Sequence, residues 1–164
     1  MTTFAITPAT RNDVADIESL VRELAVYEKL EHLMVSTPED FERELFGPNS
    51  VIECIVAKEG ERTVGFALFF HNFSTFLGRR GLYLEDLFVK PECRGKGYGK
   101  ALLVRLAQIA VERNCGRFEW SVLDWNTPSI KFYEAMGATV MPEWNLVRAT
   151  GDSLARMAAM HDQP

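Results

Sequence analysis

The sequence predicts a mixed α/β protein that folds as one domain over residues 1–164. Stretches with apolar residues at helical spacing alternate with short runs of apolar and β-branched residues, in the order β, α, α, several strands, α, β, α, β. The length of 164 residues is that of one ordinary domain. A content of 47% hydrophobic and 25% charged residues is typical of a soluble globular chain. We therefore expect one hydrophobic core built around one sheet.

The first 50 residues predict one strand followed by two helices. Residues 4–6 form a short apolar strand, and polar residues then precede a helix that ends near Glu28. The apolar residues on one face of this helix are Val14, Ile17, Leu20, Val21 and Leu24. Thr37 and Pro38 begin a second helix, because a hydroxyl caps the first turn and proline fits there. Gly47 ends this helix.

The middle of the chain predicts three strands and the longest amphipathic helix. Apolar and β-branched residues are dense over 51–57 and 64–70, and the charged residues between them are typical of a hairpin turn. Residues 82–89 form the next strand. After a glycine-rich run, a helix carries its apolar face on Leu102, Leu103, Leu106, Ile109 and Ala110. Residues 114–116 end that helix.

The last third of the chain predicts a strand, a short helix and further strand. Residues 117–123 form a strand, Asn126 opens a short helix, and Gly137 closes it. Residues 140–150 are expected to form a final strand pair or a strand-like segment, and residues 152–160 a last turn or two of helix. No repeat or linker interrupts the chain, which favours the single domain.

Composition predicts where the protein is located in the cell and which kinds of binding site it lacks. No apolar stretch is long enough to span a bilayer and the N-terminus lacks the pattern of a secretion signal, so we expect a cytoplasmic protein. Cys54, Cys93 and Cys115 are far apart, which predicts free thiols. The three histidines lack the spacing of a metal site, so no metal is expected. A net charge of −5 argues against nonspecific binding to nucleic acid.

A glycine-rich run joins the strand at 82–89 to the amphipathic helix. Its residues are Arg94, Gly95, Lys96, Gly97, Tyr98, Gly99 and Lys100. Backbone N–H groups and the positive end of the helix dipole meet there, which is typical of a phosphate-binding loop. The spacing matches neither the P-loop nor the dinucleotide fingerprint and leaves the pattern Arg-x-x-Gly-x-Gly. The alternative is a turn that only connects a strand to a helix.

This pattern resembles the pyrophosphate-binding motif of the GNAT family of N-acetyltransferases. The resemblance implies a single-domain GNAT fold, with a mixed, mostly antiparallel sheet of about six to seven strands that splay at the centre and are flanked by helices. It also implies acetyl-CoA as the co-substrate. The cofactor-binding residues that it implies are the run 94–100, Leu87, Phe88 and Val89 in the splayed strand, and Asn126 and Ser129 downstream.

A closer resemblance, over nearly the whole chain, is to the diamine (spermidine/spermine) and thialysine acetyltransferase branch. It rests on residues 8–10, 23–28, 82–86 and 125–133, whereas residues 141–145 depart from the pattern of the branch. It implies a polyamine or a thialysine-like amino acid as acceptor and a homodimer with the C-terminal segment or last strands at the interface. The acceptor-binding residues that it implies are Tyr27, Glu28, Glu85, Asp86 and Glu143.

Acetyl transfer to an aliphatic amine needs a base, because the ammonium group is protonated near neutral pH, and an acid for the departing thiolate. By resemblance, Glu85 is expected to act as the base through a water molecule and Tyr133 as the acid. An N–H group near Leu87 would polarise the thioester carbonyl. Transfer is expected directly within a ternary complex, and Cys93 is interpreted as a packing residue. In a regular strand Asp86 would face away from Glu85, and the bulge that the resemblance implies would change this.

Two other functions stay open on the sequence. The same fold could acetylate lysines or N-termini of proteins, since an acidic cluster also accepts a lysine side chain. A non-catalytic acyl-CoA-binding module would keep the glycine-rich run but lack the base and the acid.

Overall fold

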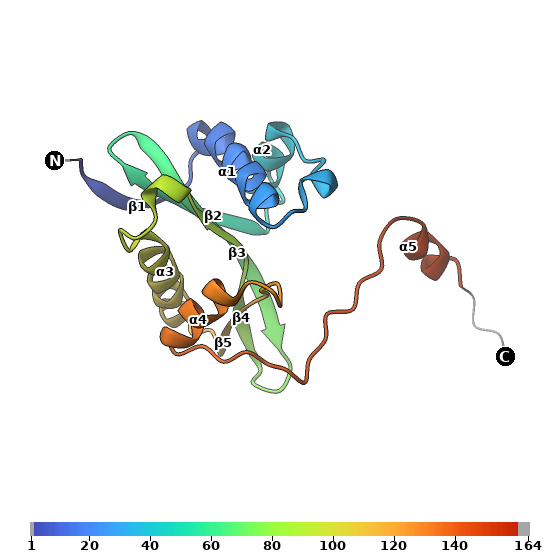
Figure 1. Ribbon diagram of the computed structural model, residues 1–164. Coiled ribbons are helices and arrows are strands. Elements are labelled where there is room, and N and C mark those ends of the chain that lie inside the picture. The colour runs from blue at the N-terminus through green and yellow to red at the C-terminus, as the bar shows by residue number, and fades with distance from the viewer. Residues whose placement is uncertain (1, 161–164) are drawn as a thin grey trace. The chain divides into compact units, whose positions relative to one another are not determined.

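The computed structural model describes residues 2–160, which form two compact units that divide after Leu123. The first unit contains the sheet and three α-helices, and the second contains two short helices (Figure 1). The strands are β1 Phe4–Pro8, β2 Ile52–Glu59, β3 Arg62–Ser74, β4 Arg79–Val89 and β5 Arg117–Trp120. The α-helices of the first unit are α1 Val14–Tyr27, α2 Pro38–Phe46 and α3 Tyr98–Glu112, and its 3-10 turns are Arg11–Asp13, Glu31–Leu33 and Pro91–Cys93.

The five strands form one sheet in the order β1-β2-β3-β4-β5. The pairs are antiparallel except β4 with β5, which is parallel, so the predicted mixed and mostly antiparallel sheet is confirmed. The predicted number of six to seven strands is wrong for residues 2–160. Residues 140–150, expected to be a strand pair, form no ladder in the described chain, since a strand exists only where a partner accepts its hydrogen bonds.

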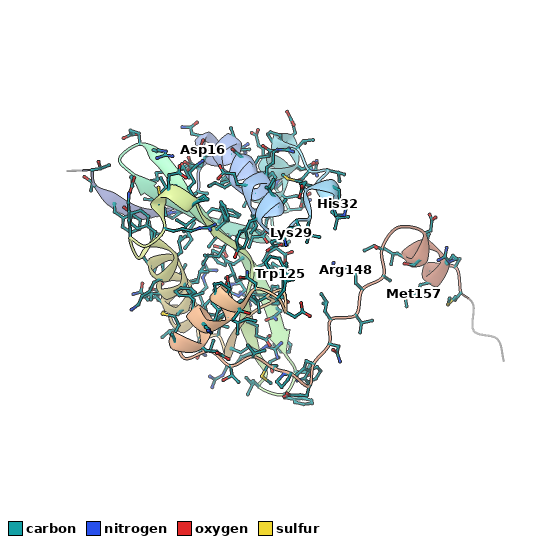
Figure 2. All side chains as sticks on the ribbon, viewed as in Figure 1. Asp16, Lys29, His32, Trp125, Arg148 and Met157 are labelled. Atoms are coloured by element: carbon teal, nitrogen blue, oxygen red, sulfur yellow. The ribbon has the colours of Figure 1, made fainter. Side chains whose placement is uncertain are left out.

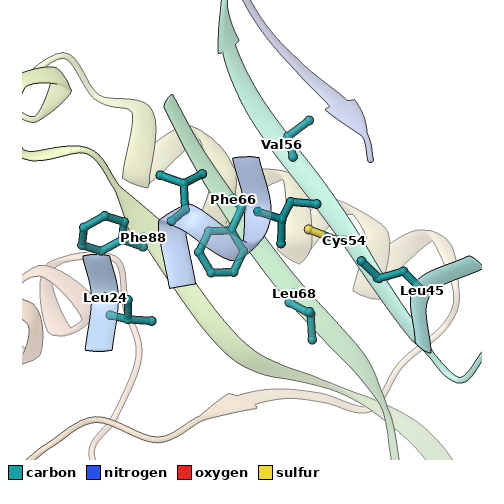
Figure 3. Close-up of a cluster of buried hydrophobic side chains, with 9 residues drawn as sticks. Leu24, Leu45, Cys54, Val56, Phe66, Leu68 and Phe88 are labelled. Carbon is teal, nitrogen blue, oxygen red and sulfur yellow. The ribbon is translucent and has the colours of Figure 1, made fainter. Parts of the chain in front are cut away.

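Helices α1 and α2 cover one face of the sheet and α3 covers the other (Figure 1). The cluster under α1 is built from residues that the ladders place opposite one another, such as Phe66 beside Phe88 (Figure 3). Its members are Ile17, Leu20, Leu24, Leu45, Cys54, Val56, Phe66, Leu68 and Phe88. The predicted apolar faces of both long helices are therefore confirmed as core, because Leu102, Leu103 and Leu106 of α3 are buried as well.

One extra residue interrupts the ladder between β3 and β4. Leu68 is opposite Asp86 and Phe69 is opposite Leu84, which leaves Glu85 as the extra residue of a β-bulge. Directly opposite residues share a face of the sheet. Leu68 packs under α1, so Asp86 lies on the α1 face, whereas Leu84 shares the other face with Phe69. The bulge implied by the family resemblance is present.

The parallel pairing of β4 with β5 covers only part of β4. It runs from Gly81 opposite Arg117 to Leu84 opposite Trp120, and β5 ends there, three residues earlier than predicted. The described part of the chain supplies no β5 partner for residues 85–89. The backbone of this half of β4 is open on its β5 side.

The remaining helix boundaries agree with the sequence. The α2 helix has its predicted cap, in which the Thr37 hydroxyl accepts a hydrogen bond from Asp40 N–H. In the second unit, helix α4 is Thr127–Ala135 and helix α5 is Gly151–Ala158. The predicted helix opening at Asn126 is confirmed, because the Asn126 side chain accepts from Ser129 N–H at 3.4 Å.

Candidate functional site

The glycine-rich run forms a tight turn that ends as the N-terminus of α3. Gly95 and Gly97 have φ of 78° and 83°, a left-handed conformation in which a side chain is strained. A Cβ at either position would meet no atom within 4 Å, so backbone conformation is the reason for glycine there. Gly97 is the N-cap, and its carbonyl accepts the first helical bond from Ala101 N–H at 2.9 Å. The amides of the first turn therefore point out of a helix of 15 residues.

The side chains of this run are less available than its amides. Lys96 Nζ donates to Glu59 Oε1 at 2.7 Å, and the Tyr98 hydroxyl donates to the same oxygen at 2.5 Å. The hydrogen bond from Lys96 is the largest cause that lowers the pKa of Glu59. Tyr98 also stacks on Phe4 with ring centroids 4.1 Å apart. The sequence predicts Glu59 in a hairpin turn and does not predict this contact, because Glu59 and Lys96 are 37 residues apart.

The end of β4 offers a second set of backbone groups beside the turn. Lys90 N–H donates to Val64 O at 2.9 Å, so alternation along the strand turns the backbone groups of Leu87 and Val89 away from β3. They face the side on which β5 has already ended. The Val89 carbonyl accepts from Arg94 Nε at 3.0 Å. Open strand amides next to a helix N-terminus fit a ligand that joins a phosphate to an amide-bearing arm.

Three carboxylates gather at the bulge of β4 and the end of α1. Burial is the main cause that raises the pKa of Asp86 to about 7, and the charges of Glu85 and Glu28 raise it further. Burial also raises the pKa of Glu28, the residue that caps the C-terminus of α1. Lys29, the next residue, has a φ of 62° and turns the chain out of the helix (Figure 2). Glu85 itself is exposed. The structure therefore brings together three of the predicted acceptor-binding residues.

The guanidinium group of Arg94 lies between two aromatic rings of the first unit. Its Cζ is 5.2 Å from the ring centroid of Tyr27 and 5.2 Å from that of Phe88. Tyr27, predicted to bind the acceptor, and Phe88, predicted to bind the cofactor, thus share one neighbour.

The second unit carries the other predicted residues. Asn126 is buried and caps α4, and Ser129 supplies the N–H that its side chain accepts. Tyr133 is a half-buried residue of α4 whose ring lies 5.4 Å from that of Phe132. Glu143 is exposed in the segment that follows α4.

The cysteines lie as the sequence predicts. All three are free, and Cys93 is 1% exposed, so its interpretation as a packing residue is confirmed. Burial raises the pKa of the Cys54 thiol to about 12. Within residues 2–160, His, Cys, Asp and Glu side chains form no group of three that could hold a metal ion. No helix in that range is long and apolar enough to cross a membrane.

Comparison with known proteins identifies the family of this chain. Residues 16–138 match the model of the Acetyltransferase (GNAT) family. A thialysine N-epsilon-acetyltransferase of Sus scrofa is 34% identical, over 96% of this chain and 99% of that protein. L-ornithine N5-acetyltransferase of Arabidopsis thaliana is 35% identical, over 89% of this chain and 84% of that protein. An integron cassette protein of V. cholerae has a solved structure with a TM-score of 0.82 at 28% identity, over 98% of this chain and 100% of that chain. The chain belongs to the acetyltransferase (GNAT) family and is an acetyl-CoA-dependent N-acetyltransferase.

Proposed function

We propose that the acceptor is a primary amine of a small cationic molecule, either a polyamine or a thialysine-like amino acid. The observation that carries this proposal is the group of three carboxylates, Glu28, Glu85 and Asp86, at the bulge of β4 and the end of α1. Such a group attracts an ammonium ion and orients it. The relatives named for thialysine and for ornithine, which are 34% and 35% identical to this chain, support the same acceptor class. Tyr27 and Glu143 are the further acceptor contacts in this proposal.

The turn and the open half of β4 are the proposed cofactor site. Acetyl-CoA supplies an acetyl group already activated as a thioester. The first-turn amides of α3, at Tyr98, Gly99 and Lys100, hold phosphate oxygens, helped by the turn at Gly95 and Gly97. The N–H groups of Leu87 and Val89 pair with the amide-bearing arm as a strand would. Asn126 and Ser129 join this site by the family resemblance.

Proton transfer in this proposal uses the carboxylates of the bulge and a tyrosine. Glu85 is the base that the resemblance implies, and the raised pKa of Asp86 supports a role for the neighbouring carboxyl. A base that titrates near neutral pH can take a proton from the amine and still be regenerated in water. Tyr133 donates the proton that the departing thiolate needs. The acetyl group passes directly from thioester to amine, with no residue of this chain acylated on the way.

A thiol-release assay over a panel of amines tests this function. We expect turnover with polyamines, thialysine or ornithine, and a loss of about 100-fold in kcat for Tyr133→Phe because the acid is removed. Glu85→Gln should lower kcat as well if the exposed carboxylate is the base. Glu112→Gln is the matched control for Glu85→Gln, since Glu112 is an exposed carboxylate at the C-terminal end of α3, paired with Arg105 at 2.8 Å. It should keep the activity of the unmodified protein.

The same assay separates the alternatives. Lack of turnover with every amine, or full activity in both Tyr133→Phe and Glu85→Gln, contradicts the proposal. A clear preference for lysine peptides or peptide N-termini would favour a protein acetyltransferase. Calorimetric binding of acetyl-CoA without turnover would favour the non-catalytic binding module.

We also propose a homodimer in which the C-terminal segment of one copy packs on a second copy. The segment after α4 is rich in exposed apolar side chains, which include Trp144, Leu146, Val147 and Met157. Several exposed apolar side chains within one segment are typical of an interface. Analytical ultracentrifugation should show a dimer that Val147→Asp shifts towards monomer. Val111→Asp, at an exposed valine of α3, is the control and should stay dimeric. A protein that sediments only as monomer contradicts this proposal.

A further inference from the structure

We propose that Arg94 is a positioning residue that holds the acceptor-binding end of α1 against the cofactor-binding end of β4. The names of these two ends rest on the proposed function. The motif Arg-x-x-Gly-x-Gly begins at this residue, and its charge suggests a phosphate ligand. The contacts of its guanidinium group point to a different role.

Three contacts fix the Arg94 side chain over the end of β4. Nε donates to Val89 O at 3.0 Å, which uses the carbonyl at the open edge of the strand. The guanidinium carbon Cζ lies 5.2 Å from the ring centroid of Phe88 and 5.2 Å from that of Tyr27. The main chain turns back on itself after β4, because Arg94 N–H donates to Pro91 O at 3.2 Å. This turn lets the Arg94 side chain reach back to the end of β4. The positive charge is thus held between two aromatic faces.

The two rings differ in how firmly the rest of the fold holds them. Phe88 is 4% exposed and belongs to the cluster under α1, so its ring is fixed by packing. Tyr27 is the last residue of α1 and is 37% exposed. Arg94 therefore connects a rigid ring to a ring at the edge of the structure. Glu28 follows Tyr27 directly, so the same contact sets where this carboxylate lies.

A second contact joins the same two elements one turn earlier in α1. Lys90 Nζ donates to Glu23 Oε1 at 2.7 Å. With this ion pair in place, loss of the Arg94 contacts would free only the last turn of α1 and would leave the helix docked. We therefore expect an effect on the acceptor and a small effect on stability.

Lys100 provides the contrast within the same motif. It lies in the first turn of α3, it is exposed, and its ammonium group has no side-chain partner among residues 2–160. Its ammonium group is available to a phosphate, whereas the guanidinium of Arg94, although that residue is also exposed, already donates from Nε to Val89 O and lies over two rings. Loss of Lys100 should weaken coenzyme A binding, and loss of Arg94 should also change acceptor binding. Arginine suits this position because its planar guanidinium group can stack on aromatic rings while its Nε–H donates a hydrogen bond. Lysine has no Nε and no planar group, so it cannot make both contacts.

A double-mutant cycle tests the proposal. Arg94→Gln and Tyr27→Leu are made singly and together, and the acceptor KM is measured at saturating acetyl-CoA. We expect each single variant to raise the acceptor KM about tenfold and the double variant to be no worse than either one, because both remove the same contact. Tyr27→Phe keeps the ring and should therefore keep its coupling to Arg94 in the same cycle, whatever its own effect on the acceptor KM. Arg94→Lys keeps the charge and should not rescue.

Two further measurements separate positioning from phosphate binding and from loss of activity. Lys100→Gln should weaken coenzyme A in calorimetry and leave the acceptor KM unchanged. Hydrogen exchange of amides in residues 26–35 should slow when coenzyme A binds to the unmodified protein and should not slow in Arg94→Gln. This readout needs no turnover, so it tests the proposal even if every amine fails as a substrate. Additive effects in the cycle, rescue by Arg94→Lys, or unchanged exchange on binding would each overturn it.

Discussion

Asp86→Asn is expected to lower kcat/KM for the amine by about 100-fold or more and to make the protein more stable at about pH 8. The loss follows if the carboxyl takes part in removing the proton of the ammonium group. The gain in stability follows from the environment of Asp86. Burial first, and then the charges of Glu85 and Glu28, raise its pKa to about 7, so its ionised form is unfavourable in the folded state.

The sign of the pH dependence follows from the same pKa. The folded protein holds this proton more tightly than the unfolded chain, whose carboxyl titrates near 3.8. The contribution to the free energy of unfolding is therefore full below about pH 4 and is lost as the pH rises through about 7. An asparagine side chain does not ionise, so in Asp86→Asn this part of the free energy of unfolding does not change with pH. In the unmodified protein kcat/KM should rise as the pH increases through about 7. This rise should be absent from the pH profile of Asp86→Asn.

Urea unfolding at two pH values and a pH profile of kcat/KM measure both effects. Asp16→Asn is the matched control, because Asp16 is exposed in the first turn of α1 (Figure 2). It should keep its rate and change the unfolding free energy little. An Asp86→Asn protein that is inactive and also less stable at about pH 8 would indicate a structural role and contradict this prediction. Full activity would leave Glu85 as the remaining candidate base.

Gly97→Val is expected to weaken coenzyme A binding by about 10-fold to 100-fold. Valine in the left-handed conformation at a φ of 83° costs about 1–3 kcal/mol, which the chain avoids by rotating the turn. Because Gly97 is the N-cap of α3, that rotation would redirect the first-turn amides. Calorimetry with coenzyme A in the absence of acceptor measures the change directly.

Gly78→Val is the matched control for this change. Gly78 has a φ of 63° in the hairpin between β3 and β4, and a Cβ there would meet no atom within 4 Å. The substitution carries a similar backbone strain away from the turn. We expect both variants to lose similar stability, with only Gly97→Val losing affinity. Equal affinity in the two variants would mean that the turn does not bind the phosphates.

The part of the site that the sequence predicts well is local. The glycines of positive φ, the start of α3 and the cap at Asn126 depend on residues within one or two turns of one another, so a short pattern predicts them. Family resemblance adds the bulge at Glu85, which composition alone does not predict. These features depend on the backbone conformation of single residues and on the capping of free N–H groups at helix N-termini. Both effects act over only a few residues.

The parts that the sequence does not predict depend on distant partners. The pairing of Lys96 with Glu59 and the stacking of Arg94 on Tyr27 arise from the register of β2 and the docking of α1. Residues 140–150 have the apolar content of a strand, yet pairing requires a second backbone that the sequence cannot locate. Periodicity reports which face of an element is buried and not which element covers it.

The bulge at Glu85 also bears on how such a site can evolve. In a regular strand two adjacent acids must point to opposite faces, and replacing either inward residue would put a charge into a packed layer. Insertion of a single codon adds Glu85 without placing a second acid in a packed layer, since Leu84 and Asp86 keep the faces that their partners Phe69 and Leu68 dictate. The added residue is accommodated at the surface. Gain or loss of one residue at this position could therefore alter the charge presented to an amine while both layers of the core retain their ancestral packing.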